Sequence, residues 1–249
     1  MSHTYKKNYL KQVIFRIDFE KVELSDFETF KTQVNERFDE GSKKQGKFGN
    51  FQLKVDSGEV INSTEDVEIW HFLDTKTGNK FEASPTHCLI EYFAYKNSED
   101  LIENIKTLCN KFLEIHGVKQ ASRIGLRYIN EIEIDSVKKL EDWSTYILEE
   151  LLTASHTLKS KGKTPTRILN QAEFKAGSYS TVFKYGIWND KYPSPITGSS
   201  YILDIDCFTR LPVDLDEGEL VSVTSSLNKE AEEVFELSIT DKLRKEMEK

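Results

Sequence analysis

Apolar and polar positions alternate along several stretches of this chain with a period of two residues, which is typical of a β-strand with one buried face. In residues 12–19 the apolar side chains recur at every second position: Val13, Phe15, Ile17 and Phe19. Residues 123–134, RIGLRYINEIEI, alternate in the same way but carry polar groups on both faces. Further runs rich in apolar residues predict strands at 51–55, 66–74, 87–95 and 201–207.

Three other stretches place apolar residues three or four positions apart, the spacing of a helix with one buried stripe. The first begins at Ser25 and Asp26 and ends near Gly41, and the second begins with Ser98 as its N-cap and ends at Gly117. The third is the last long helix, with five residues in its stripe: Leu220, Val223, Leu227, Ala231 and Val234. After the first helix, the polar segment GSKKQGKFGN predicts a loop at 41–50.

From Glu141 a second half of the chain begins, with a predicted helix that puts Trp143, Ile147 and Leu151 on one side. Two strands, 167–176 and 180–188, follow a basic loop and predict a hairpin. Runs of consecutive strands imply antiparallel pairing. The expected fold class is therefore α+β, with mainly antiparallel sheets and helices packed on one face. Two related halves, 1–137 and 138–249, are one arrangement, and a single continuous domain is the other.

Length and composition limit the kinds of protein that this chain can be. At 249 residues the chain can bury a core without disulfides or a structural metal. Cys88, Cys109 and Cys207 are widely separated among apolar residues, so we expect free thiols in a reducing compartment. The first fifteen residues hold no apolar run of signal-peptide length, and no window approaches the roughly 20 apolar residues of a membrane span. We therefore expect a soluble cytoplasmic protein.

The formal net charge of -8 opposes a general attraction to nucleic-acid phosphates. One basic segment runs against this trend, with four charges in nine residues: Lys159, Lys161, Lys163 and Arg167. Nucleic-acid surfaces usually place aromatic groups among such charges, whereas this segment offers only serine and threonine. We interpret it first as a solvated linker and second as a phosphate contact.

Common catalytic motifs are absent from the chain: there is no phosphate loop, no dinucleotide fingerprint and no nucleophile elbow. The five histidines are His3, His71, His87, His116 and His156. No two of them are three or four positions apart, the spacing that would put them on one helix face, so a classical zinc site is not expected. We interpret His71 and His87 as partly buried strand residues. The sequence therefore names no catalytic residue and no cofactor.

Asp204 and Asp206 share one strand face in the stretch LDIDCF. Two carboxylates so placed can hold a divalent metal through hard oxygens, as phosphodiester-cleaving enzymes require. The alternative is that they line a solvated sheet face, and we favour it because no histidine or basic partner is adjacent. Four later acids would then stabilise the start of the last long helix: Asp214, Asp216, Glu217 and Glu219.

The strand at 123–134 has a different polar group on each face. Tyr128 and Asn130 share a face with apolar neighbours, so Asn130 is a buried carboxamide that needs hydrogen-bond partners or a ligand. Arg123 and Arg127 lie on the opposite face, where Gly125 leaves room beside Arg127. Arg127 either pairs with an acid across the sheet or offers its guanidinium to an anionic partner. The four polar residues are the candidate ligand-binding site.

The block R-x-G-L-R-Y-I-N at 123–130 resembles the central block of a sporadically distributed, uncharacterised prokaryotic family of similar length. The similarity extends to IEYFAY, LDID and FELSITD, but the proline-containing N-terminal entry of the family is absent. The resemblance implies a bacterial or archaeal cytoplasmic protein of an accessory gene set, of the defence or toxin-antitoxin type. It transfers no catalytic residue, because the family has no assigned activity.

The leading hypothesis from the sequence is a non-enzymatic binding or regulatory module that recognises a partner protein or a small anionic ligand. The second is a metal-dependent phosphodiesterase or nuclease that uses Asp204 and Asp206. The third is a nucleic-acid-binding protein that uses residues 159–167. The identity of the ligand, any cofactor and the oligomeric state stay open.

Overall fold

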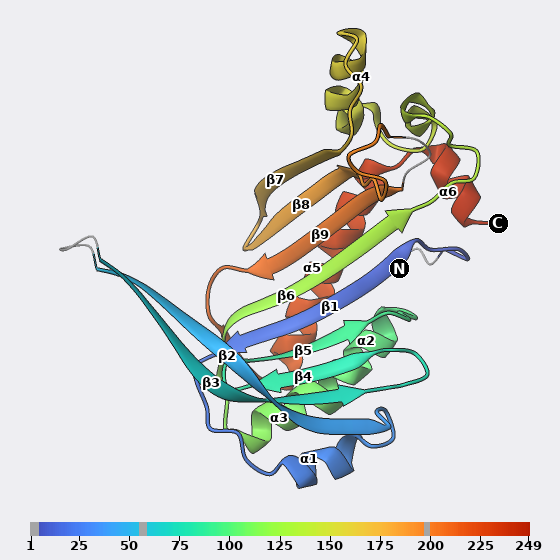
Figure 1. Cartoon of the computed structure of the whole chain (residues 1–249). Helices are drawn as coiled ribbons and strands as arrows, with labels where there is room; N and C mark the ends of the chain where they lie inside the picture. Colours follow the sequence, from blue (N-terminus) through green and yellow to red (C-terminus); the bar gives the residue numbers. More distant parts are fainter. Residues whose placement is uncertain (1–4, 55–58, 197–199) are drawn as a thin grey trace.

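One antiparallel sheet organises the computed structural model of the chain, which describes residues 5–54, 59–196 and 200–249 (Figure 1). Together with the helices that pack against it, this sheet confirms the expected α+β fold class. Ten strands are found in the described residues: β1 (Leu10–Phe19), β2 (Glu40–Lys54), β3 (Glu59–Leu73), β4 (Lys80–Ser84), β5 (His87–Tyr92), β6 (Gln120–Ile132), β7 (Ile168–Ala176), β8 (Tyr179–Ile187), β9 (Tyr201–Thr209) and β10 (Val213–Asp214).

The strands follow the order β2-β3-β4-β5-β1-β6-β9-β8-β7, and β10 pairs with the first residues of β6. β6 therefore lies inside the sheet, between β1 and β9. Because β1 precedes residue 137 and β9 follows it, the sheet is continuous across the predicted boundary between the two halves. The strand that carries the central polar block is also the strand that joins them.

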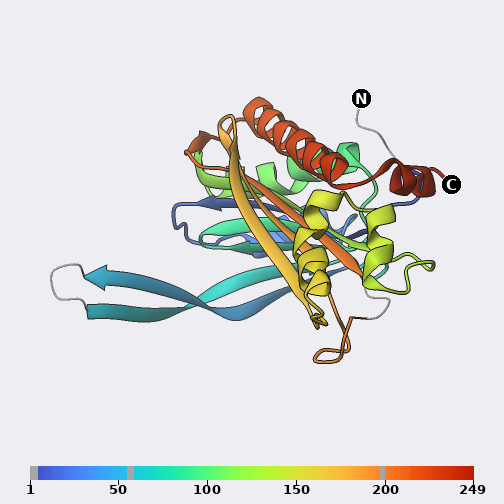
Figure 2. The same cartoon turned by 90° about the horizontal axis from the view of Figure 1, so that it is seen from above.

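Helices cover one face of the sheet, and the long helix α5 runs along that face beside α2 (Figures 1 and 2). The helical segments are α1 (Phe27–Val34), α2 (Ser98–Asn104), the π turn η1 (Ile105–Cys109), α3 (Asn110–Ile115), the 3-10 turns η2 (Leu140–Thr145) and η3 (Glu149–Leu152), α4 (Thr153–Ser160), α5 (Glu217–Ser238) and α6 (Asp241–Met247). Within the described residues, no helix has both the length and the apolarity that crossing a membrane requires.

The core lies between the sheet and these helices. Val13, Phe15 and Ile17 of β1 are fully buried, while the residues between them are partly exposed on the other face. The predicted alternation of β1 and of β6 is thereby confirmed. Aromatic rings fill the part of the core under α1 and α3, where Phe30 packs edge-on against Phe112 at 6.0 Å. The three cysteines are free and buried, as the sequence predicts.

The predicted helix at 98–117 forms, with a π turn in its middle. Its last part, α3, ends at Ile115, two residues before the predicted end at Gly117. Gly117 follows the C-cap with a φ of 65°, a conformation that costs glycine little. The prediction of Ser98 as its N-cap is wrong by one residue. Asn97 is the cap, because its side-chain oxygen accepts from the backbone nitrogen of Asp100 at 2.8 Å.

The predicted loop at 41–50 is wrong, since these residues belong to β2, and the first helix ends at Val34 rather than near Gly41. β2 is an edge strand that pairs with β3 along its whole length and projects from the body with it (Figure 1). Solvent-exposed side chains on both of its faces, such as Ser42 and Lys43, leave no hydrophobic pattern to recognise. Val55, the last residue of the strand predicted at 51–55, lies outside the described residues, as does His3.

The helix predicted from Glu141 to Leu151 is also wrong. Two short 3-10 turns take its place, and Ile147 between them forms a bridge with Ile239. The backbone nitrogen of Leu148 donates to Ser238, and that of Thr240 donates to Tyr146. These bonds to a distant segment replace the local hydrogen bonds that a continuous helix needs. In addition, β4 forms between the strands predicted at 66–74 and 87–95, in a segment for which no strand is predicted.

Candidate functional site

The sheet separates the four predicted ligand-binding residues into two pairs. Arg123 and Arg127 lie on the face of β6 that the helices leave uncovered, and Tyr128 and Asn130 lie on the helix-covered face. Tyr128 and Asn130 are 8% and 5% exposed, which makes Asn130 the buried carboxamide that the alternation predicts. The two faces therefore form two separate polar environments.

Arg127 forms an ion pair across the sheet, the first of the two alternatives that the sequence leaves open. Its Nε and Nη2 atoms each lie 2.7 Å from one oxygen of Asp204 on β9. This two-pronged geometry is the strongest that a guanidinium and a carboxylate adopt. The hydrogen bonds to Asp204 raise the pKa of Arg127 above its ordinary value. The guanidinium thus has a partner within the protein.

Arg123 is held by two acids on the same face. Its Nη2 atom lies 3.2 Å from both oxygens of Asp206, and its Nη1 atom lies 3.7 Å from Asp18 of β1. The guanidinium also stacks on the ring of Phe208 at 4.7 Å. Gly125 makes this position possible, because a Cβ atom there would lie 2.6 Å from Nη1 of Arg123. The room that Gly125 leaves is therefore filled by the guanidinium of Arg123.

The two carboxylates of the metal hypothesis are both paired with arginine. Burial raises the pKa of Asp206, and the charges of Arg123 and Arg127 oppose that rise. Among the described residues, no group of three or more His, Cys, Asp or Glu side chains is arranged to hold a metal ion. Asp204 and Asp206 therefore complete a row of alternating charges along the uncovered face of the sheet.

The later acids take structural positions. Asp216 caps α5 by accepting from the backbone nitrogen of Glu219 at 2.7 Å. Asp214 accepts from the side chain of Gln120 at 3.0 Å. The side chain of Glu217 lies outside what the structure describes. The prediction that these acids stabilise the start of the last long helix is confirmed for Asp216.

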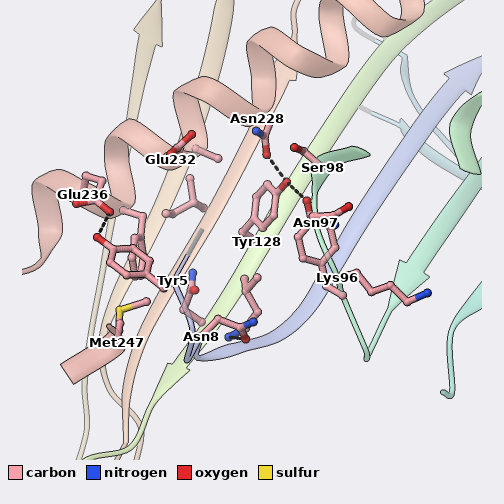
Figure 3. A pocket seen from close by; sticks show the side chains of 16 residues that line it. Tyr5, Asn8, Lys96, Asn97, Ser98, Tyr128, Asn228, Glu232, Glu236 and Met247 are labelled. Atoms are coloured by element: carbon pink, nitrogen blue, oxygen red, sulfur yellow. Dashed lines mark hydrogen bonds between the residues drawn. The ribbon is translucent and has the colours of Figure 1, made fainter. Parts of the chain in front are cut away.

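A cavity of about 160 Å³ lies on the helix-covered side, directly over Tyr128 and Asn130 (Figure 3). Its other walls come from the segment before β1, the residues that lead into α2, one side of α5 and the end of α6. Ile205 of β9, Phe235 of α5 and Met247 of α6 supply apolar surface. A volume of about 150 Å³ accommodates benzene in a protein interior, so this cavity is large enough for a small organic molecule.

Hydrogen bonds among side chains orient the polar groups of the cavity (Figure 3). The hydroxyl of Tyr128 donates to Oδ1 of Asn228 at 2.5 Å and lies 3.3 Å from the hydroxyl of Tyr95. The side-chain nitrogen of Asn130 donates to the carbonyl of Leu203 at 3.2 Å. Within the described part of the chain, the carboxamide oxygen of Asn130 and the carboxamide nitrogen of Asn228 have no hydrogen-bond partner. One acceptor and one donor are thus unused.

The charged groups of the cavity are mainly carboxylates. Glu236 of α5 accepts from the hydroxyl of Tyr5 at 2.6 Å and pairs with Arg244 of α6 at 2.7 Å. Glu232 lines the same wall one helical turn earlier. Burial raises the pKa of Tyr5 above its ordinary value, and the bond to Glu236 adds to the rise. The tyrosine hydroxyls therefore stay neutral at physiological pH.

A groove of about 550 Å³ continues from the cavity between α2 and α5. Four residues line both the groove and the cavity: Ser98, Asn228, Glu232 and Glu236. The groove adds two acids, Glu99 of α2 and Glu233 of α5, and the apolar Leu101 and Ile102. A molecule longer than the cavity would extend along this groove.

A second polar cluster lies on the uncovered face, around Glu82. Oγ of Ser84 lies 2.7 Å from Nδ1 of His87, and Nε2 of His87 lies 3.3 Å from Glu82. Serine, histidine and glutamate in this order resemble the nucleophile, base and acid of a catalytic triad. Oγ of Ser84 also accepts from the backbone nitrogens of Thr86 and His87, and Ser84 is 3% exposed, so it closes a turn. His71, 3.4 Å from Glu82, and His87 are partly buried strand residues, as predicted.

The basic segment has aromatic partners that the sequence does not indicate. The guanidinium of Arg167 lies 4.6 Å from the ring centre of Trp188 and 4.5 Å from that of Tyr192. Both rings are partly exposed, at 39% and 57%. Lys159 forms an ion pair with Glu141. The aromatic residues come from a loop more than twenty positions further along the chain, so the segment alone gave no sign of them.

Sequence reasoning also missed the partners of Tyr128 in the cavity. Tyr95 lies in the IEYFAY segment, which the sequence singles out only by resemblance. Asn228 lies on α5 between the buried residues Leu227 and Ala231. A polar residue beside a buried stripe was the one feature of the sequence that could have pointed to a partner for Tyr128. Its meaning depends on Tyr128, which is a hundred residues away in the chain.

No protein-family model matches the chain, and no curated protein matches its sequence. The resemblance of residues 123–130 to an uncharacterised prokaryotic family therefore stays a prediction. Fold and site together define an α+β protein with a cavity between an antiparallel sheet and its covering helices.

Proposed function

We propose that this protein is a ligand-binding module and that the cavity over Tyr128 and Asn130 is its binding site. The observation that supports the proposal is the meeting of unused carboxamide groups, tyrosine hydroxyls and apolar side chains in one cavity. Sites for small molecules are typically apolar concavities with a few oriented polar groups. A ligand that uses the oxygen of Asn130 and the nitrogen of Asn228 would satisfy both carboxamides.

We propose recognition without chemistry, because hydroxyls and carboxamides dominate the floor of the cavity. Burial raises the pKa of Tyr128 well above its ordinary value, so this phenol keeps its proton at neutral pH. Proton transfer works best with a group whose pKa lies near the working pH. A regulatory role in a prokaryotic accessory gene set is the setting that the resemblance implies, and it is part of the proposal.

The cavity supports ligand binding better than Arg127 does. An anion at Arg127 would have to displace the carboxylate of Asp204, which is 7% exposed and already makes two hydrogen bonds of 2.7 Å. Displacement would leave a buried carboxylate without its partner, which is costly. The nuclease hypothesis has less support for the same reason, since its two carboxylates are engaged by Arg127 and Arg123.

The variant Ala231→Leu tests the proposal. Ala231 lines the cavity from α5 and is 3% exposed, so the larger side chain fills part of the volume without removing a polar group. A fragment library screened by protein-observed NMR should shift the amide signals of Tyr128 and Asn228 in the wild type and not in this variant. Ala154→Leu, in α4 and away from the cavity, is the control and should respond like the wild type.

Two outcomes of that screen contradict the proposal. One is that no fragment shifts the signals around the cavity. The other is that Ala231→Leu, folded by its thermal midpoint, responds as the wild type does. In both cases the cavity is a packing irregularity between α5 and β6.

A second candidate function, single-stranded nucleic-acid binding, is supported by the stacking of Arg167 with Trp188 and Tyr192. Partly exposed rings beside basic side chains are the usual platform for unpaired bases. The expected result is an affinity for oligonucleotides that falls steeply with salt and weakens in Trp188→Ala. A flat salt dependence, or equal binding by Trp188→Ala, rejects this function.

A further inference from the structure

Carboxylates surround the candidate binding cavity on the side of α5. Glu232 and Glu236 line the cavity itself, and Glu99 and Glu233 line the groove that continues from it. Arg244 pairs with Glu236 at 2.7 Å and offsets one of these charges. Carboxylates outnumber cationic side chains in the two linings, so the cavity and groove carry a net negative charge.

The lysines of the same linings are turned outward. The side chain of Lys96 is 73% exposed and lies 3.9 Å from Asp100, and Figure 3 shows it directed away from the other labelled side chains. The side chain of Lys229 is 78% exposed and lies 3.8 Å from Glu233. Exposed amines so close to carboxylates add little positive potential inside the cavity.

The tyrosine hydroxyls respond to this negative charge. Burial raises the pKa of Tyr95 to about 12, and the charges of Glu99, Asp100 and Glu232 add to the rise. Burial is the main cause of the raised pKa of Tyr128, followed by Tyr95 and Cys207, and the charge of Glu232 adds a smaller part. Burial disfavours any charged group, but the carboxylate contribution to these pKa values disfavours an anionic ligand and favours a cation.

The tyrosine rings and the oxygen of Asn130 suit a cation as well, whereas the nitrogen of Asn228 is a donor and is left to another part of the ligand. The rings of Tyr95 and Tyr128 are perpendicular, with centres 5.8 Å apart, and ring faces attract ammonium groups. The carboxamide oxygen of Asn130, a residue that is 5% exposed, has no hydrogen-bond partner within the described part of the chain. An ammonium group has only donors, so it needs acceptors of this kind.

We infer that the ligand of this cavity is a small organic cation with a primary ammonium group. Its ammonium donates to the oxygen of Asn130 and lies on the Glu232 side of the cavity, and its apolar part packs against Tyr128 and Phe235. The inference rests on the proposed function, because it names the ligand class of the same site. It replaces the anionic ligand that the arginines of β6 suggested.

Three molecules of one size and different charge test the inference: benzylammonium, benzyl alcohol and benzoate. Each places one polar group beside a benzene ring, which matches a cavity of about 160 Å³. Calorimetry at low ionic strength should give benzylammonium an affinity at least about tenfold higher than that of benzyl alcohol, because its hydrogen bonds are charge-assisted. Benzoate should bind more weakly than benzyl alcohol.

The variant Glu232→Gln removes the carboxylate while keeping its shape. We expect it to lower the affinity for benzylammonium to that for benzyl alcohol and to leave benzyl alcohol binding unchanged. Glu230→Gln is the matched control, since Glu230 lies on the same helix, contacts Thr181 of β8 and does not line the cavity. It removes the same charge and should bind all three molecules as the wild type does.

The possible failures are distinguishable. Equal affinity for the three molecules, or a preference for benzoate, overturns the cationic ligand and leaves the cavity as a binding site. Equal losses in Glu232→Gln and Glu230→Gln assign the effect to net charge and also overturn the inference. If none of the three molecules binds, the inference is overturned, and the fragment screen with Ala231→Leu decides separately on the cavity.

Discussion

Arg127 of β6 pairs with Asp204 of β9, although the residue directly opposite it in the ladder is Asp206. The diagonal contact leaves Asp206 for Arg123, which lies four residues earlier on the same strand. Each arginine thus takes one acid of β9, and the charges alternate along the uncovered face. A one-residue slip of β9 would move both carboxylates to the helix-covered face, so this row fixes the strand register.

Replacing Arg127 tests the structural role of this pair. Arg127→Ala leaves the carboxylate of Asp204, whose side chain is 10% exposed, without its partner. Breaking a fully buried pair costs about 3–5 kcal/mol, and the partial exposure of Arg127 lowers the expected loss to about 2–3 kcal/mol. Urea denaturation should show this loss. The double variant Arg127→Ala, Asp204→Ala should recover part of it, and a single variant as stable as the wild type would contradict the assignment.

Gly125→Ala tests whether the glycine makes room for Arg123. The added methyl group would lie 2.6 Å from Nη1, so the guanidinium must move away from Asp206. Because a long side chain can adjust, we expect a loss of only about 1 kcal/mol in the free energy of unfolding. In an Arg123→Ala background the same substitution should cost much less, a coupling that a double-mutant cycle measures. Equal losses in both backgrounds would show that the methyl group meets the backbone instead.

The sequence is informative wherever a strand has one wet and one dry face. The alternation in β1 and β6 predicts the buried face of each strand correctly, and it predicts that the guanidinium of Arg127 and the carboxamide of Asn130 lie on opposite faces. β2 shows the limit of this reasoning. Its side chains that the structure describes are mostly exposed, and backbone pairing with β3 leaves no trace in residue types.

The candidate site is only half predictable for a related reason. Asn130 is noticeable because a buried carboxamide needs partners, and this argument requires the sequence of one strand alone. Asn228 becomes a partner of Tyr128 only when α5 packs over β6. Tyr95 reaches Tyr128 from the segment that leads into α2. Similarly, the segment around Ile147 has helical spacing, but its backbone bonds to residues near Ile239 override it. Contacts between segments about a hundred residues apart decide both cases.

The start of α2 offers a test between two adjacent residues. Asn97 caps the helix through Asp100, whereas the hydroxyl of Ser98, among the residues that the structure describes, bonds only to Glu99 at 3.4 Å. Asn97→Ala should therefore reduce the free energy of unfolding by about 1 kcal/mol, and Ser98→Ala should change it by less than about 0.5 kcal/mol. Thermal or urea unfolding of the two variants decides the assignment. A larger loss from Ser98→Ala would restore the cap that the sequence suggests.

The buried tyrosines predict how stability changes at alkaline pH. Burial and nearby carboxylates raise the pKa of Tyr95 from 10.0 to about 12 in the folded state. Above pH 10 the unfolded chain loses this proton while the folded protein keeps it, so the free energy of unfolding falls as pH rises, by about 1.4 kcal/mol per pH unit for one such group. Urea unfolding between pH 8 and 11.5 should therefore give a shallower decline for Tyr95→Phe than for the wild type. Tyr192→Phe, at a residue that is 57% exposed, serves as the control, and parallel curves for all three proteins would contradict the effect of burial at Tyr95.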